Sequence, residues 1–396
     1  MGNRIPPALV AQADTFVALR RDLHRHPELG FEELRTSALV AEKLSEWGYA
    51  VTRGVGGTGV VGQLRRGTGQ RRLGLRADMD ALPITEATGL PHASCHAGLM
   101  HACGHDGHTA MLLAAAHHLA KHGQFSGTLN LIFQPAEEGL GGARKMMEDG
   151  LFERFPCDAI FAMHNMPGHP PGHLLFRSGA FMASSENITI TLHGVGGHGA
   201  LPHHSADPVV AGAAIVMGLQ SIVARNVPPL QMAVITVGAF QAGEANNVIP
   251  QTATLKLSVR SLNRDVRELL NRRIRELVES QAHSYGVRAD IDFRGGYPVL
   301  VNTPAETEFA RQIGRELVGS DHITEQAEPL TGSEDFAFML EDIPGSYLLI
   351  GNGDAATGGH GACMVHNPNY DFEDRNIAVG SAYWVRLAER FLDGTS

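Results

Sequence analysis

The alternation of helical stretches with short apolar runs over residues 8–160 limits most strongly what this chain can fold into. The helical stretch Glu32–Trp47 is stopped by Gly48, and Leu129–Phe133 is one of the apolar runs. Such alternation is typical of α/β domains, in which strands and helices take turns around a substantially parallel sheet. The sequence therefore predicts an α/β fold with a central, mostly parallel sheet.

The pattern changes near Ser185. Strand-like segments then alternate with helices expected over residues 207–225 and 265–285, which is the pattern of a compact α+β module. Past Pro298 the first pattern resumes, and Thr303–Glu306 has the spacing of a capping box that opens a helix. A second kind of domain is therefore expected in the middle of the chain.

The length of the chain sets the number of domains. At 396 residues it exceeds what one hydrophobic core usually supports, so we expect two domains. Residues 1–184 and 299–396 are expected to form one split α/β domain. Residues 185–298 are expected to form an inserted α+β domain of the ferredoxin-like kind.

Charge and cysteine content argue against several classes of protein. The formal net charge of −10 disfavours a general affinity for nucleic acid or anionic membrane.

Residues 1–27 lack the apolar segment of about 7 to 15 residues that a secretory signal needs. The run Val209–Leu219 is shorter than a membrane span of roughly 18 residues. The four cysteines form no CxxC pair, which suits reduced thiols. We expect a soluble, cytoplasmic protein that binds neither nucleic acid nor membrane.

One short segment carries a high density of metal-binding side chains. Residues 100–108 contain one thiol, three imidazoles and one carboxylate. Histidine is the commonest metal ligand, and a thiolate favours zinc or a late transition metal, although oxygen and nitrogen ligands also admit manganese. Cys103 and His105 are therefore candidate ligands. The other cysteines, which lack such neighbours, are expected to be small buried hydrophobes: Cys95, Cys157 and Cys363.

Further candidate ligands stand where strands are expected to end. Glu138 follows the run Leu129–Phe133, His164 follows the run 159–163, and His366 lies near the end of the chain. In parallel α/β sheets ligands gather at the carboxyl ends of the strands, so these side chains are expected to converge. The sequence predicts one or two divalent ions with an open position for a water, whose pKa the ions lower.

The Glu137–Glu138 pair suggests a division of labour. One carboxylate would bind metal while its neighbour moves a proton from the water to the leaving nitrogen. A solvated acidic pair is the alternative, but it is disfavoured directly after a buried strand. Asp78 and Asp80 either end a strand or orient ligands, and His101 and His108 are expected to cap a helix or support ligands.

The motifs resemble those of the M20 metallopeptidases. The similarity is to the amidohydrolase subfamily, which includes hippurate hydrolases, N-acyl-amino acid amidohydrolases and plant auxin-conjugate hydrolases. It implies a catalytic domain with a dinuclear metal site, an inserted lid domain, and hydrolysis of the amide that joins an acyl group to an amino acid. The segments that carry the resemblance run nearly end to end: Asp22–Leu29, Arg76–Pro83, His101–Asp106, Pro135–Gly139 and Gly332–Phe336.

The resemblance also implies roles for single residues. It makes Glu137 the general acid/base, and Asp78 and Asp80, which stand beside the site, are expected to orient the ligands. It makes Cys103 the ligand that bridges the two metals. The remaining ligands that it implies are His105, Glu138, His164 and His366.

In the inserted domain the resemblance points to three residues. His198 would help to stabilise the oxyanion, sometimes from a partner subunit, and Asn247 and Arg260 would contact the carboxylate or amide of the substrate. Two alternatives stay open at this point. The glycines around His198 could serve a tight bend alone, and Arg260 could pair with an acidic residue on the surface of the lid.

These observations together predict a metal-dependent amidohydrolase. A metal-bridging hydroxide would attack the amide of a hippurate-like or aminoacylase-like substrate, with Glu137 transferring the proton. Two ions are expected, Zn or Mn first and Co or Ni next, and a homodimer is expected to form through the lid. The alternatives are a deacylase or dipeptidase acting on N-acetyl-diaminopimelate, short peptides or carbamoyl amino acids, and a metal-binding sensor without turnover. The acyl group, the native metal and the state of the lid stay open.

Overall fold

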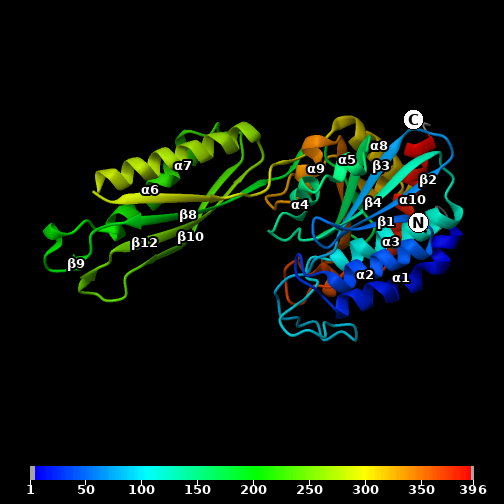
Figure 1. Ribbon diagram of the computed structural model, residues 1–396, viewed down its shortest axis with the longest axis horizontal. Coiled ribbons are helices and arrows are strands. Elements are labelled where there is room, and N and C mark those ends of the chain that lie inside the picture. The colour runs from blue at the N-terminus through cyan, green and yellow to red at the C-terminus, as the bar shows by residue number, and fades with distance from the viewer. Residues whose placement is uncertain (1–4, 394–396) are drawn as a thin grey trace. The chain divides into compact units, whose positions relative to one another are not determined.

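The computed structural model describes residues 5–393 and divides into two compact units (Figure 1). The first unit contains the described residues up to Gly179, the segment Val301–Glu328, and the described residues from Phe338 onward. The second unit contains Ala180–Leu300 together with Pro329–Ala337. The second unit thus interrupts the sequence of the first twice, and its short segment Pro329–Ala337 lies within the range 299–396 that we expected in the first domain. The catalytic and lid roles expected for the two parts of the chain stay predictions.

The first unit is built on a sheet of eight strands in the order β1-β2-β4-β3-β5-β16-β6-β15. Its four neighbours β4, β3, β5 and β16 are parallel, so their carboxyl ends lie along one edge. The prediction of an α/β fold with a large, mostly parallel central sheet is confirmed. The strands are β1 (Ala50–Val55), β2 (Gly59–Arg66), β3 (Arg72–Asp78), β4 (Gly127–Gln134), β5 (Ala159–Pro167), β6 (Leu174–Leu175), β15 (Ile323–Thr324) and β16 (Gly345–Gly353).

Helices cover the central strands, which explains their composition. Every residue of β4 and β16 is buried, and a strand covered on both faces is a near-continuous apolar run. Helices α1 and α2 both pack against α3, and α3 packs against α10 (Figure 1). The helices are α1 (Pro7–Arg25), α2 (Leu34–Glu46), α3 (His105–His122), α4 (Gly142–Glu148), α5 (Leu151–Arg154), α8 (Pro304–Val318), α9 (Phe336–Asp342) and α10 (Asn376–Asp393).

The capping box expected at Thr303–Glu306 is wrong, although helix α8 does begin there. The side chain of Thr303 makes no cap hydrogen bond. Its hydroxyl instead donates to the carbonyl of Gly345 at 2.9 Å and accepts from the Gly345 N–H at 2.8 Å. The hydroxyl is therefore used to fix the first residue of β16 rather than the helix end.

The second unit contains an antiparallel sheet in the order β10-β12-β8-β13, with α6 and α7 on one face (Figure 1). The side chains of Asp207 and Asn263 accept hydrogen bonds from backbone N–H groups in the first turns of these helices, as good N-caps do. The elements are β8 (Ser184–His193), β9 (Gly197–His198), α6 (Pro208–Arg225), β10 (Ala233–Ala242), β11 (Val248–Ile249), β12 (Thr252–Ser261), α7 (Arg264–Ser284) and β13 (Arg288–Arg294).

Helix α6 is apolar over a longer stretch than the run Val209–Leu219. Its 18 residues have a mean hydropathy of 1.5, so that by length and composition alone it could cross a membrane; among the described residues no other helix meets this criterion. The apolar segment is therefore longer than the run Val209–Leu219. One stripe of the helix packs into the core of the unit: Ala211, Ile215, Leu219 and Ile222. That stripe is what a core helix requires.

The cysteines outside the 100–108 segment differ from the expectation of burial. Cys157 is buried, Cys95 is exposed, and Cys363 is half-buried. Cys95 and Cys363 lie in the loops that follow β3 and β16 rather than in regular elements, and surface loops seldom bury side chains fully. Only Cys157 acts as the small buried hydrophobe that the sequence predicted.

Candidate metal centre

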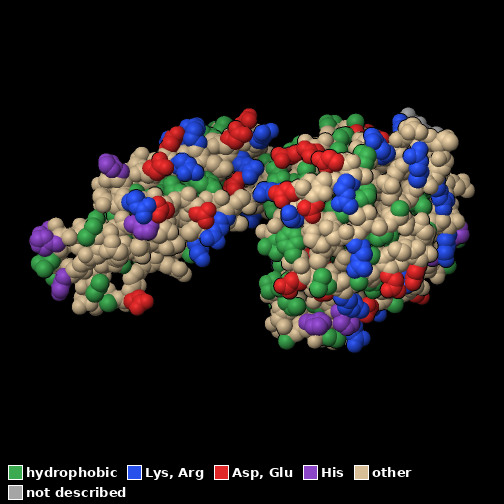
Figure 2. Space-filling model, in the orientation of Figure 1, with side chains coloured by type: hydrophobic (Ala, Val, Ile, Leu, Met, Phe, Trp, Pro, Cys, Tyr) green, Lys and Arg blue, Asp and Glu red, His purple; other side chains and the backbone are tan. Residues whose placement is uncertain are grey.

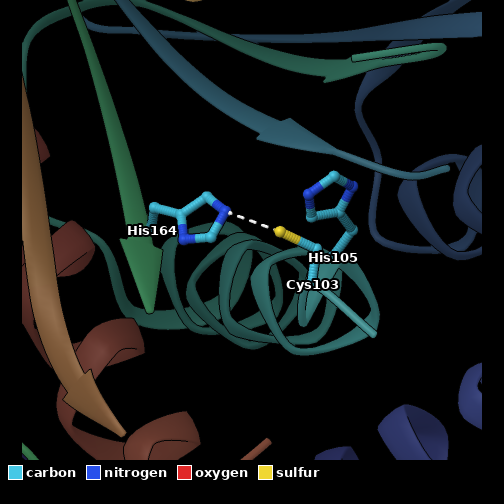
Figure 3. Close-up of side chains that lie close together, drawn as sticks. All are labelled: Cys103, His105 and His164. Atoms are coloured by element: carbon cyan, nitrogen blue, oxygen red, sulfur yellow. Dashed lines mark hydrogen bonds between the residues drawn. The ribbon is translucent and has the colours of Figure 1, made fainter. Parts of the chain in front are cut away.

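Cys103, His105 and His164 meet near the carboxyl ends of the parallel strands. Cys103 lies just before α3, His105 is the first residue of that helix, and His164 is on β5. The Sγ of Cys103 lies 3.3 Å from Nε2 of His164 (Figure 3). One possible ligand atom from each of the three residues lies within 4.8 Å of the others. The fold thus brings three predicted ligands together.

Two further groups extend this cluster. Cys103, Glu138 and His366 also have ligand atoms within 4.8 Å of one another, and so do His105, Glu137 and Glu138. The groups share members, so all five predicted ligands and the predicted general acid/base lie in one connected cluster within the first unit.

Left-handed backbone shapes the loops of the cluster. Gly104 has φ 86°, and a Cβ at that position would lie 2.2 Å from Oδ1 of Asn165. Ala136, directly before Glu137, has φ 53°, and His366 itself has φ 66°. A left-handed residue other than glycine costs about 1 to 3 kcal/mol, so the contacts around it must hold it in place.

Asp80 orients two members of the cluster. Its Oδ1 lies 3.1 Å from Nδ1 of His105, and its Oδ2 accepts a 2.9 Å hydrogen bond from the backbone N–H of Glu138. Because a carboxylate only accepts, Nδ1 of His105 donates and the Nε2 of the neutral ring is left for a metal. His164 is fixed in the same way, since its Nδ1 donates to the carbonyl of Asn165 at 2.6 Å. Both rings therefore have the tautomer that suits a ligand.

Asp78 acts on His108 rather than on a metal. Its Oδ1 lies 2.6 Å from Nδ1 of His108, and its Oδ2 accepts a 2.7 Å hydrogen bond from Arg76. The other ring nitrogen of His108 lies 2.7 Å from Oδ1 of Asn165. Asp78, His105 and His108 are close enough to be a metal group, but both nitrogens of His108 are already engaged. This arrangement fits the supporting role expected for His108.

The electrostatics of the cluster favour positive charge. Burial lowers the pKa of His105, but the neighbouring carboxylates, above all Asp78, outweigh burial and raise this pKa to about 10. Burial and the neighbouring glutamates raise the pKa of the Cys103 thiol well above its ordinary value. Burial also lowers the pKa of His164, which keeps this ring neutral. A cation would neutralise the negative potential and turn Cys103 into a thiolate.

Two buried atoms face each other without a hydrogen bond. Among the described residues, Nε2 of His105 and Oε1 of Glu138 have no hydrogen-bond partner, and they lie 4.0 Å apart. The same Oε1 lies 3.2 Å from Nε2 of His366, but not with hydrogen-bond geometry. Atoms that bind one ion lie about 3 to 4 Å from each other. Nitrogen, oxygen and sulfur donors at these separations fit a divalent cation.

A buried ionic network that the sequence did not predict fixes the start of α3. Nε of Arg20 donates to Asp106 at 2.7 Å, and Nδ1 of His24 lies 2.9 Å from the same carboxylate oxygen. Burial would raise the pKa of Asp106, but the charges of Arg20 and His24 outweigh it and hold this pKa far below its ordinary value. Asp106 follows His105, so the network holds the backbone of a candidate ligand. The spacing of Arg20 and His24 by four residues on one helix was the available signal.

His101 does not cap helix α3. The N-cap residue of this helix is Gly104, which makes no side-chain cap. His101 is buried, and neither ring nitrogen has a hydrogen-bond partner among the described residues. Burial lowers its pKa to about 4, so the ring is neutral near pH 7. Of the two roles expected for His101, capping of α3 is therefore wrong, and support of the candidate ligands stays a prediction.

The three candidate residues of the inserted domain lie in the second unit. His198 is exposed, and its Nδ1 accepts a 3.0 Å hydrogen bond from the N–H of Ala200. Asn247 is also exposed. It lies beside His198, since its carbonyl accepts a 2.8 Å hydrogen bond from the N–H of Gly199. Arg260 is half-buried on β12.

Arg260 contacts a hydroxyl, not the acidic surface residue that was the alternative expected from the sequence. Its Nη1 donates to the hydroxyl of Ser333 at 2.8 Å, and Ser333 belongs to the same unit. Burial lowers the pKa of Arg260, which shows that the guanidinium is partly removed from water. The residue is thus held by a neutral partner.

Comparison with known proteins gives the family. The sequence profile of the peptidase family M20/M25/M40 matches residues 74–390. The hippurate hydrolase of Campylobacter jejuni is 44% identical over 390 residues, which cover 98% of this chain and 100% of that protein. The N-acetyldiaminopimelate deacetylase of Geobacillus thermodenitrificans is 41% identical over 379 residues, which cover 93% of this chain and 97% of that protein.

A solved structure supports the same assignment. A dinuclear metal binding peptidase of the M20 family from Bacillus subtilis superimposes with a TM-score of 0.82 at 33% identity. The superposition covers 97% of this chain and 99% of that one. With the profile match, these similarities show that the chain belongs to the peptidase family M20/M25/M40 and is a metal-dependent hydrolase.

Proposed function

We propose that this protein hydrolyses the amide bond of N-acyl amino acids, with Glu137 as general acid/base. The observation that carries the proposal is the position of Glu137 beside Glu138, in one group with His105. A carboxylate that neighbours the ligands without being one of them can accept a proton from a water and deliver it to the leaving nitrogen. The amide hydrolases among the relatives support this substrate class.

The other residues of the cluster divide the remaining work. Asp80 holds both the His105 ring and the backbone N–H of Glu138, which fixes two candidate metal ligands relative to each other. Bound divalent cations would polarise the amide carbonyl and lower the pKa of a water at the site. The segment Cys103–His105 and the Glu137 side chain are buried, and Glu138 is half-buried. The reacting groups would therefore be held in a site of low dielectric.

The arrangement of the ligands favours two cations. Cys103 belongs to one group with His105 and His164 and to another with Glu138 and His366. A thiolate shared by two groups is suited to bridging two ions, and the dinuclear relative from Bacillus subtilis supports this number. We propose Zn or Mn as the native metal, with Co or Ni as alternatives, because the donor set mixes sulfur, nitrogen and oxygen.

His198, Asn247 and Arg260 are proposed to recognise the substrate. Since Nδ1 of His198 accepts a hydrogen bond, the neutral ring carries its proton on Nε2 and can donate it to an oxyanion. Arg260 offers a guanidinium that can pair with a carboxylate, and its neutral partner Ser333 leaves that charge uncompensated. A substrate with a free carboxylate suits this residue.

We propose a homodimer formed through the second unit. Helix α6 has exposed apolar side chains at Val210 and Met217, which are 50% and 73% exposed. Strand β10 is an edge strand without a charged residue, although edge strands are usually protected by charge. Acidic and basic side chains instead gather along α7 (Figure 2). The apolar helix and the uncharged edge suit a second copy of this chain.

The dimer is tested by size-exclusion chromatography with light scattering. Met217→Glu should shift the protein to a monomer, because it places a charge on the apolar face. Arg272→Glu on α7 is the matched control, since this side chain is 60% exposed and lies on the charged helix. A parent that is monomeric at micromolar concentration would contradict the proposal.

We also propose a cytoplasmic location. A reduced thiol at Cys103 supports it, because disulfides form in oxidising compartments.

The substrate class is tested by a screen for released amine. The parent protein, reconstituted with Zn, Mn, Co or Ni, would be offered hippurate, N-acetyl amino acids, N-acetyl-diaminopimelate, carbamoyl amino acids and dipeptides. We expect the highest kcat/KM on an N-acyl amino acid. Preference for N-acetyl-diaminopimelate would favour the second candidate, which the deacetylase relative supports. No turnover with any metal would favour a metal-binding sensor.

A further inference from the structure

Glu33 is a fully buried carboxylate at the start of helix α2, and both of its oxygens are used. Oε1 accepts a 2.8 Å hydrogen bond from the backbone N–H of Ala136, and Oε2 accepts a hydrogen bond from the hydroxyl of Thr58. Burying an ionisable group costs free energy unless its polar atoms are hydrogen-bonded. The contact with Ala136 joins residues that are 103 positions apart in the sequence.

Ala136 is the strained residue directly before Glu137. Its φ of 53° is left-handed, and its Cα is so close to Gly30 that a Cβ on Gly30 would lie 2.9 Å away. On the other side, the carbonyl of Ala136 accepts a 3.0 Å hydrogen bond from the N–H of Gly142. The Ala136 residue is therefore held at its N–H by Glu33, at its carbonyl by Gly142, and at its Cα by Gly30.

The backbone N–H of Glu138, two residues after Ala136, is held by a different carboxylate. Asp80 accepts the N–H of Glu138, while Glu33 accepts the N–H of Ala136. Asp80 also contacts the His105 ring, whereas neither oxygen of Glu33 makes a hydrogen bond to a candidate ligand. The two carboxylates therefore hold the residues that directly precede and follow Glu137 in the chain.

We propose that Glu33 is a positioning residue for Glu137: by holding the Ala136 N–H it keeps the peptide in the left-handed conformation that directs the Glu137 carboxylate into the cluster. This inference rests on the proposed role of Glu137 in amide hydrolysis. Without the hydrogen bond the Ala136 backbone can relax to an ordinary φ, and the side chain that follows is redirected. A displacement of about 1 Å at a reacting group can cost about a hundredfold in rate.

Three variants of the full-length, metal-loaded protein test the proposal. Glu33→Ala removes the acceptor. Glu33→Gln keeps an acceptor oxygen for the Ala136 N–H, and its amide N–H faces the Thr58 hydroxyl, which then accepts a hydrogen bond instead of donating one. Thr58→Val is the matched control, because it disturbs the same buried carboxylate and leaves the Ala136 hydrogen bond in place. The measurements are kcat, KM, bound metal per chain, and hydrogen exchange of the backbone segment that contains Ala136.

We expect Glu33→Ala to lose about a hundredfold in kcat with KM changed by less than about threefold, since positioning acts on the chemical step. Metal content should stay at the parent value, and exchange at Ala136 should become faster. Glu33→Gln and Thr58→Val should keep kcat within about threefold of the parent and keep the slow exchange.

Other outcomes overturn the proposal. A folded Glu33→Ala variant with parental kcat would do so, as would a loss of metal that parallels the loss of rate. Equal losses in Glu33→Ala and Thr58→Val would point to general packing rather than to the Ala136 contact. If the parent cleaves none of the amides, the proposed function fails, whereas unchanged exchange at Ala136 in Glu33→Ala would separately refute the hold on this peptide.

Discussion

The candidate residues of the two units are held in opposite ways. In the first unit Cys103 and His105 are buried, and His105 is oriented by a carboxylate. In the second unit His198 and Asn247 are exposed, and at the end of the unit where β9 lies histidines gather at the surface (Figure 2). Groups that must act on a water and a metal gain from a fixed, dry site, whereas groups that meet a substrate must be reachable.

This difference separates two kinds of effect. Substitutions in the buried cluster should change metal content or kcat, because they alter a preorganised site. Substitutions at the exposed residues should leave metal content unchanged and act only when substrate is present. Three predictions test that separation, and a fourth tests how a buried carboxylate behind the cluster affects stability.

The largest effect is expected from Cys103→Ala. This change removes the residue that is common to two ligand groups, so both cations should be held less tightly. We expect metal per chain, measured by atomic emission after dialysis, to fall well below the parent value, and amide hydrolysis to fall with it. Cys157→Ala is the matched control, since Cys157 is buried but lies outside the cluster. Unchanged metal in Cys103→Ala would contradict the assignment of a bridging ligand.

Glu137→Gln should affect the rate without affecting the metal. The amide keeps the size of the side chain but cannot take up a proton, and general acid–base groups contribute about 10² to 10⁴ in rate. We expect kcat to fall within this range while metal content and melting temperature stay close to those of the parent. A loss of metal would move Glu137 into the ligand set, and a retained rate would remove it from catalysis.

His198→Ala tests the exposed side of the comparison. Removal of one oxyanion donor typically costs about 10² to 10³ in kcat. His198 is not one of the proposed metal ligands, so metal content should not change. The matched control is His203→Ala, which removes another exposed imidazole of the same unit. Equal rates for His198→Ala and the parent would support the alternative that the glycines around His198 serve a bend alone.

Much of the cluster could be predicted because parallel strands impose a simple rule. Cys103, His164 and Glu138 stand where apolar runs end or helices begin, and the parallel arrangement of β3, β4 and β5 places those ends on one edge. The spacing of ligands within the 100–108 segment was visible without any structure. The central sheet followed from the alternation over residues 8–160, and the change of pattern near Ser185 predicted a second kind of domain in the middle of the chain.

The supporting contacts could not be predicted, because they depend on pairs distant in sequence. The hydrogen bond from Arg20 to Asp106 spans 86 positions, and no periodicity in a single sequence reports such a pair. Thr303 shows the opposite case, in which a local signal was present but tertiary structure used the hydroxyl for Gly345. The short-range rules therefore located the candidate ligands, and the packing of the fold decided which side chains contact them.

The smallest effect concerns stability rather than rate, and it again depends on Glu33. Burial raises the pKa of this carboxyl from 4.5 to about 7. The folded state thus binds the proton more tightly than the unfolded state, so this stabilising contribution is fully present below about pH 4.5 and is lost as the pH rises through 7. A shift of this size corresponds to about 3 kcal/mol.

Glu33→Gln should remove this pH dependence, since its amide does not ionise. We expect the free energy of unfolding in urea, measured at pH 5 and pH 8, to fall less between the two values in Glu33→Gln than in the parent. Glu42→Gln on the same helix is the control, because Glu42 is exposed and should follow the parent. If Glu33→Gln and the parent lose the same free energy, Glu33 does not titrate in this range. The buried carboxylate would then be ionised at both values, and its hold on Ala136 would not weaken as the pH falls to 5.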